Sequence, residues 1–197
     1  MKLYERLPDS VTVAGKKFRL DLDFRHVLRM MEVLSRDDLI PPAREYLALK
    51  CVMRHPPRRA GPVLEELRKM LFPEQKHQAD GKKLTDFAQD ANMIRAAFRQ
   101  AYGIDLYRDE VHWMEFQALL AALPEGSRYS EVVGIRAREM PPATKYNQAE
   151  REWLAKAKAA CALEMSEDER ERAYAEGVKS VFAGLLAWAE GSGNHGG

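Results

Sequence analysis

Four carboxylates lie close together in the sequence and could do acid–base chemistry: Asp86, Asp90, Asp105 and Asp109. Paired carboxylates transfer protons when their surroundings push their pKa values apart. Each of these four, however, is expected at the start of a helix or in the turn between two helices. At such positions a carboxylate accepts hydrogen bonds from free backbone N–H groups. We therefore interpret the four as capping residues and not as a catalytic site.

One histidine has a spacing that suits a metal. His112 and Glu115 lie three residues apart, which places two possible ligands on one face of a helix. A metal site needs three or four ligands, and these two residues alone do not supply them. The sequence also lacks the Walker phosphate loop, the nucleophile elbow and the zinc-protease motif of common enzymes. The sequence therefore predicts no enzyme, no cofactor and no metal, and a surface histidine beside Trp113.

Basic residues gather around two prolines, where they could meet phosphate groups: Arg54, His55, Arg58 and Arg59. At the end of a helix, such residues also interact favourably with the helix dipole and with water. The whole chain carries 31 basic and 30 acidic residues, a formal charge of only +1. Nucleic acid is therefore the less favoured partner.

The composition is that of an ordinary globular protein. Of 197 residues, 46% are hydrophobic and 31% are charged. Cys51 and Cys161 belong to no metal or redox motif, so we expect buried free thiols and a reducing compartment. No segment approaches the roughly 20 apolar residues that a membrane helix requires, and no signal sequence is recognisable at the N-terminus. These features predict a soluble cytosolic protein that does not enter membranes.

The first structural element expected is a β-hairpin over residues 11–22. Apolar residues alternate on both sides of a turn at Gly15, and alternation of period two is typical of strands. A lone hairpin is only marginally stable in water, so this one must lie on the helices that follow. The alternating residues are Val11, Val13, Phe18, Leu20 and Leu22.

Three helices are expected after the hairpin. Asp21 or Asp23 can cap the first of them. The second runs from Ala43 to about Arg54 and has apolar residues on more than one side. On the third, Glu65 and Lys69 are spaced for an ion pair between neighbouring turns.

Two further helices form the middle of the chain, and their apolar residues recur every three or four positions. Thr85 is the expected N-cap of the first, and Gly103 suits its C-terminal end because glycine adopts a left-handed conformation readily. Asp109 is the expected cap of the second. The short link between them favours an antiparallel pair, in which Phe98 and Trp113 should be buried.

The last part of the chain predicts three more helices. One begins at Ser127 or Ser130 and ends near Met140, and the next begins near Asn147 with Trp153, Ala157 and Cys161 on one side. The final helix starts with a capping box at Ser166 and carries a regular apolar seam. Ordinary core packing would explain this seam, and docking of a partner or a second copy is the alternative. Its residues are Tyr174, Val178, Val181, Leu185 and Trp188.

These elements predict a mainly α fold, a multi-helix bundle-like domain of roughly seven or eight helices with a short N-terminal β-hairpin. We divide the chain into an N-terminal part with the hairpin and its helices, a polar loop, a central set of helices, a C-terminal amphipathic helix and a disordered tail. The respective ranges are 1–72, 73–83, 84–165, 166–190 and 191–197.

The central block resembles a known pattern. The residues that carry the resemblance are Asp86, Phe87, Asp90, Ile94, Phe98, Tyr102, Gly103, Ile104, Asp105, Leu106, Trp113 and Phe116. With Leu7-Pro8, Asp23-Phe24-Arg25 and Ile135-Arg136, they are similar to the bacteriophage gp-fifteen family over roughly residues 5–165. The final helix and the tail lie beyond this similarity.

The resemblance implies a function without catalytic residues. Members of this family are encoded by long-tailed phages and prophages, typically between the major tail protein and the tape measure protein. It therefore implies a tail assembly factor, a chaperone in the host cytoplasm that shields the tape measure protein and contacts other tail proteins or a second copy of itself. A structural tail or virion component is the alternative, and a nucleic-acid-binding module is the less favoured one.

Overall fold

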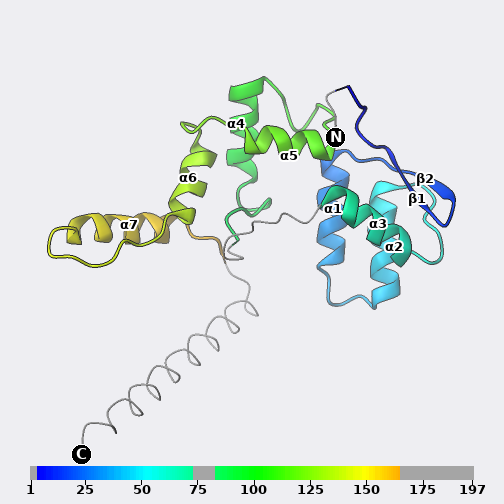
Figure 1. The fold of residues 1–197 in the computed structure, drawn as a ribbon, viewed down its shortest axis with the longest axis horizontal. Coiled ribbons are helices and arrows are strands. Elements are labelled where there is room, and N and C mark those ends of the chain that lie inside the picture. Colours follow the sequence, from blue (N-terminus) through cyan, green and yellow to red (C-terminus); the bar gives the residue numbers. More distant parts are fainter. Residues whose placement is uncertain (1–3, 73–82, 165–197) are drawn as a thin grey trace, which may run out of the picture. The chain divides into compact units, whose positions relative to one another are not determined.

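The computed structural model describes residues 4–72 and 83–164, which form a mainly α fold with an N-terminal hairpin, as the sequence predicts (Figure 1). No helix in these two ranges is long and apolar enough to span a bilayer. The elements are β1 (Ser10–Val13), β2 (Lys16–Arg19), α1 (Phe24–Leu34), α2 (Pro41–Val52), α3 (Gly61–Leu71), α4 (Ala91–Tyr102), α5 (Trp113–Ala121), α6 (Arg128–Ala137) and α7 (Gln148–Cys161).

The hairpin is confirmed, and it is shorter than the predicted range. β1 and β2 are antiparallel, with Ser10 opposite Arg19. Ala14 and Gly15 both have positive φ, 49° and 77°, which is the backbone shape that lets a two-residue turn follow the twist of the strands. Val11 is buried, and β1 packs against α3, so the hairpin lies on a helix as expected.

Helices α1 to α3 form the N-terminal part of the core. Asp23 caps α1, since its side chain accepts a hydrogen bond from the Arg25 backbone N–H. α1 and α2 lie side by side, and α3 packs on α2 (Figure 1). Helix α2 begins two residues before the expected Ala43, because two prolines fit the first turn of a helix, where their missing N–H is not needed.

The prediction that Glu65 pairs with Lys69 on α3 was wrong, because each of them pairs with another residue. Glu65 pairs with Arg68 at 3.0 Å and Glu66 pairs with Lys69 at 2.9 Å, so both pairs span three residues instead of four. Residues three and four apart lie on the same face of a helix, and either spacing brings the charges together. All four side chains are about half exposed, which keeps such pairs weak.

The predicted caps of the two middle helices were also wrong. Residues 87–90 form a turn, and α4 begins only at Ala91, so Thr85 lies too early to cap it. Helix α5 is capped by His112, whose Nδ1 accepts a hydrogen bond from the Met114 backbone N–H. Asp109 instead accepts a hydrogen bond from the Asp105 backbone N–H within the preceding turn. The end of α4 follows the prediction, because Gly103 has φ 73° there.

Helices α6 and α7 follow the sequence with one correction. Ser127 caps α6 through a hydrogen bond from the Ser130 backbone N–H, as expected. On α7, however, Trp153 is 55% exposed, whereas its neighbour Leu154 is fully buried. Successive residues on a helix point about 100° apart, so an inner face centred on Leu154 turns Trp153 outward. Cys161 is buried as a free thiol, and Cys51 is partly exposed.

Candidate functional site

An aromatic cluster joins the predicted motif residues to α1. Phe116 of α5 lies at its centre, stacked on Phe24 of α1 at 4.7 Å and on Phe98 of α4 at 5.2 Å between ring centroids. Trp113 stacks on the same ring at 5.8 Å, and Phe87 lies at 6.1 Å from it. Phe98 and Trp113 are fully buried, as the sequence predicted. The motif therefore builds a core that fixes α1, α4 and α5 against one another.

The four carboxylates singled out in the sequence do not come together in one site. Asp86 accepts hydrogen bonds from the backbone N–H groups of Ala88 and Gln89 at 2.9 Å. Its pKa lies below the usual range, first because of the hydrogen bond from Lys83 and then because of these N–H groups. Asp105 and Asp109 accept backbone hydrogen bonds at the other end of α4. Three of the four thus stabilise turns, as the capping interpretation predicts.

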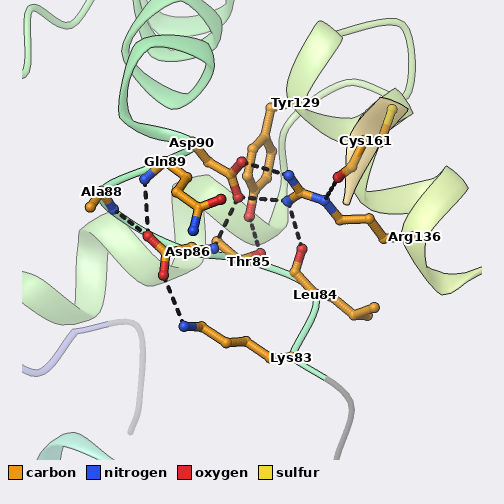
Figure 2. A network of polar contacts seen from close by, with 10 residues as sticks. All are labelled: Lys83, Leu84, Thr85, Asp86, Ala88, Gln89, Asp90, Tyr129, Arg136 and Cys161. Carbon is orange, nitrogen blue, oxygen red and sulfur yellow. Dashed lines mark hydrogen bonds and ion pairs between the residues drawn. The ribbon is translucent and has the colours of Figure 1, made fainter. Parts of the chain in front are cut away.

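Asp90 has a different role that the sequence did not reveal. It forms a bidentate ion pair with Arg136 of α6, with N–O distances of 2.7 and 2.9 Å (Figure 2). The two residues are only 1% and 9% exposed. Arg136 also donates to the carbonyl oxygens of Leu84 at 2.9 Å and Cys161 at 2.6 Å. The hydrogen bond to Asp90 raises the pKa of Arg136 further, so the guanidinium stays charged.

This buried pair connects three segments of the chain. The Asp90 side chain also accepts a hydrogen bond from the Asp86 backbone N–H at 3.0 Å, and the Lys158 amine of α7 donates to the Arg136 carbonyl at 2.9 Å. Beside it, the hydroxyl groups of Thr85 and Tyr129 are hydrogen-bonded at 2.9 Å (Figure 2). The donors of Arg136 are directed at protein oxygens, so the pair holds the turn before α4, α6 and the end of α7 together.

A second polar junction holds the start of α1 against the loop before α5. Asp23 accepts hydrogen bonds from the Arg25 guanidinium and from the Val111 backbone N–H. His112 accepts a hydrogen bond at Nδ1, so its Nε2 carries the proton and donates to the Pro8 carbonyl at 3.0 Å. Both ring nitrogens are therefore engaged by the backbone. This arrangement gives His112 a structural role, and within residues 4–72 and 83–164 no three potential ligands gather around a metal position.

A small apolar cavity opens beside the aromatic cluster. Its volume is about 220 Å³, and α1, α4, α5 and the loops before α4 and α5 all contribute to its wall. Arg25, Arg95 and the 67% exposed Tyr107 stand at its edge. The apolar part of the wall includes Phe24, Phe87, Ile94, Leu106 and Phe116. Four of these five, all but Phe24, belong to the motif of the sequence analysis.

Three arginines next to this cavity share one carboxylate. Arg95, Arg99 and Arg108 lie 3.9, 3.8 and 4.0 Å from the side-chain oxygens of Asp105. Charge-assisted hydrogen bonds are about 2.7–2.9 Å long, so none of these contacts is one. The Arg95 guanidinium lies over the Tyr107 ring at 4.0 Å, a favourable cation–π contact. The side chains of these three arginines are 44%, 64% and 86% exposed.

A shallower groove lies between α6 and α7. Its volume is about 670 Å³, and Ile135 and the exposed Trp153 lie on it.

Two other groups from the sequence analysis lie away from this groove or outside the described residues. The basic residues at 54, 55, 58 and 59 are exposed, which agrees with a solvated group. The seam from Tyr174 to Trp188 lies outside the described residues, so its docking or packing role stays a prediction.

The fold and the site define a small helical protein. In its motif region the buried polar groups hold the helices together, and an apolar cavity beside exposed arginines opens at the surface. A family model described as Bacteriophage Gp15 protein matches residues 3–163. The chain therefore belongs to this family, as the resemblance of its central block implied, and membership supports a bacteriophage structural or morphogenesis protein. No curated protein and no solved structure matches the chain.

Proposed function

We propose that this protein is a non-enzymatic tail assembly factor that binds and shields the tape measure protein in the host cytoplasm. Family membership supports the general setting, the building of a bacteriophage particle. A tape measure protein is a long helical chain with apolar stripes that are exposed until tail subunits cover them. A small partner with an apolar binding surface shields such stripes by packing onto them.

The observation that carries the proposal is the open apolar cavity on the motif region. Aromatic and aliphatic side chains from four parts of the fold line it, and it lies at the surface beside exposed arginines. The buried polar groups nearby, Asp90 and Arg136, are occupied by each other and by the backbone. The motif region thus offers an apolar surface to a partner, as a binding protein requires.

The runner-up is a structural tail component, which the family assignment supports equally well. The two functions differ in where the protein ends up. A chaperone leaves the tape measure protein when the tail tube forms, whereas a structural component stays in the particle.

Co-expression with the tape measure protein of the same phage tests the proposal. We expect the two proteins to co-purify in salt concentrations that remove non-specific contacts, and we expect mass spectrometry of purified virions to lack this chain. Retention in virions in stoichiometric amount would favour the structural component. Failure to co-purify, with the tape measure protein soluble and present, would refute the chaperone function.

A further inference from the structure

We propose that the apolar cavity and the adjoining arginines bind one kind of ligand, an amphipathic helix of the tape measure protein that carries an apolar anchor followed by carboxylates. The anchor enters the cavity, and the carboxylates pair with Arg95 and Arg99. This inference rests on the proposed function and adds to it the place and the chemistry of binding.

The size of the cavity indicates what enters it. Pockets for cofactors and other small molecules usually measure about 300–1,000 Å³. At about 220 Å³, this cavity is smaller and suits a single side chain such as leucine or phenylalanine. The rings of Phe24 and Phe116 on its wall favour an apolar or aromatic group over a polar one.

The arginines indicate what lies next to the anchor. Asp105 is one carboxylate facing three guanidinium groups, and it approaches none of them closer than 3.8 Å. Arginine binds carboxylates strongly when two N–H groups reach the two oxygens in parallel. A second and third carboxylate from a partner would supply these contacts, and the exposed side chains are free to turn toward them.

Two adjoining cavities place these contacts in a definite order along α4. The apolar cavity includes Ala91, Ile94 and Arg95. A second cavity of about 300 Å³ follows, lined by Asn92, Arg95, Ala96, Arg99 and Asp105. Arg95 belongs to both.

The spacing of the arginines fits a helical partner. Arg95 and Arg99 are four residues apart on α4, so their side chains project from successive turns of one face. A helix lying along α4 repeats its own side chains at the same interval. An apolar residue at one position, with acidic residues about four and seven positions further, would therefore meet the cavity and both arginines.

Nucleic acid fits these features less well. Phosphates would satisfy Arg95 and Arg99, but the sugar–phosphate backbone has no apolar group to fill a cavity lined by phenylalanine, isoleucine and leucine. A second copy of this chain is the other possible occupant, and it would show as a change of oligomeric state.

Two substitutions test the two halves of the site. Ala91→Trp fills the mouth of the cavity from an exposed position at the start of α4, and Arg95→Glu reverses the charge that both cavities share. The matched controls are Ala155→Trp, at an exposed alanine of α7, and Arg29→Glu, at an exposed arginine of α1. Circular dichroism and thermal melting check that each variant folds.

The binding assay uses the full chain and purified fragments that tile the tape measure protein. We expect Ala91→Trp and Arg95→Glu each to weaken binding of one fragment at least about tenfold, and each control to change it less than about twofold. Replacing by lysine only the acidic residue of that fragment that pairs with Arg95, and keeping the one that pairs with Arg99, should restore binding to the Arg95→Glu variant.

Other outcomes overturn the inference in different ways. If the wild type binds a fragment and both variants bind it equally well, the site is wrong while the proposed function stands. If the wild type binds no fragment and does not co-purify with the whole tape measure protein, the proposed function fails and this inference fails with it. Loss of duplex-DNA binding or of dimerisation in the variants, with unchanged fragment binding, would assign the surface to nucleic acid or to a second copy.

Discussion

Helix α4 has an aspartate and at least one arginine at each end, and the two ends differ. Before its first residue, Asp90 and Arg136 form a buried pair with hydrogen bonds of 2.7 and 2.9 Å. After its last turn, Asp105 faces three exposed arginines at 3.8–4.0 Å. The aspartate and arginine side chains are therefore hydrogen-bonded to each other at one end of α4 and are not at the other.

The difference separates folding from binding within one motif. A buried charge that has lost its partner is very costly, so the pair at Asp90 fixes how α4, α6 and α7 meet. Exposed charges contribute little to stability, and their side chains remain free for a partner. We infer that the pair at Asp90 and Arg136 anchors α4 and that the face of α4 from Ala91 to Arg99, with the loop after it, is available for binding.

The largest expected effect comes from a substitution in the aromatic core on which α4 packs. Trp113→Ala should lower the free energy of unfolding by about 3–5 kcal/mol, because it empties a fully buried site that packs on Phe72, Phe87 and Phe116. Urea denaturation measures this loss. Trp113→Phe is the control and should cost much less, because it keeps a ring in place. A loss below about 1 kcal/mol for the alanine variant would show that the aromatic cluster is wrongly assigned.

The next largest effect is the difference in stability between variants of the two aspartates. Asp90→Asn should cost about 3 kcal/mol, since it leaves the Arg136 charge buried without a carboxylate. Asp105→Asn should cost less than about 1 kcal/mol, because its arginines are exposed and an amide oxygen can still accept the Tyr107 backbone N–H. Denaturant unfolding of both variants measures the contrast. Equal losses would mean that the two ends of α4 do not differ as described.

A smaller effect should appear in acid. Burial raises the pKa of Asp23, but hydrogen bonds from Arg25 and Val111 and the charge of Arg25 lower it more, so it lies below the ordinary 3.8. A depressed pKa contributes stability above the unfolded value, and that stability is lost as pH falls below 3.8. Stability curves from about pH 6 to pH 2 should therefore fall less steeply for Asp23→Asn than for the wild type. Parallel curves would contradict this role of Asp23.

The smallest effect on folding should come from the open arginines. Arg99→Glu should change the free energy of unfolding by less than about 0.5 kcal/mol, because its side chain is exposed and makes no hydrogen bond within the described residues. Arg95→Glu should cost about 1 kcal/mol, because it also loses the cation–π contact with Tyr107. Thermal melting beside the wild type measures this. A loss of several kcal/mol would place these arginines in the fold and remove them from the binding surface.

Local periodicity explains why much of the fold could be predicted. The stripe through Phe98 and the stripe from Trp113 both face the core, and Gly103 ends α4, because these features depend on neighbours within one or two turns. Exact helix starts depend on competing caps, and His112 was not expected to act as one. Trp153 was misplaced because several neighbouring residues of α7 are alanines, which mark no clear inner face.

The site was harder to predict because its contacts join distant residues. Asp90 and Arg136 are 46 positions apart, and no local pattern pairs them. Asp90 was among the motif residues, and Arg136 was noted only as part of Ile135-Arg136. The cavity likewise combines α1 with the loop at Leu106 and Tyr107, a proximity that only the folded chain establishes.

Hydrogen–deuterium exchange of the full chain, with and without the tape measure protein, tests the central claim most directly. We predict that binding slows exchange in residues 91–108, at α4 and the loop that carries Leu106 and Tyr107. Residues 128–137, on the anchored side at Arg136, should exchange as in the free protein. Protection confined to α6 and the Trp153 side of α7, with residues 91–108 unchanged, would contradict the distinction between an anchored side at Asp90 and Arg136 and a binding face on α4.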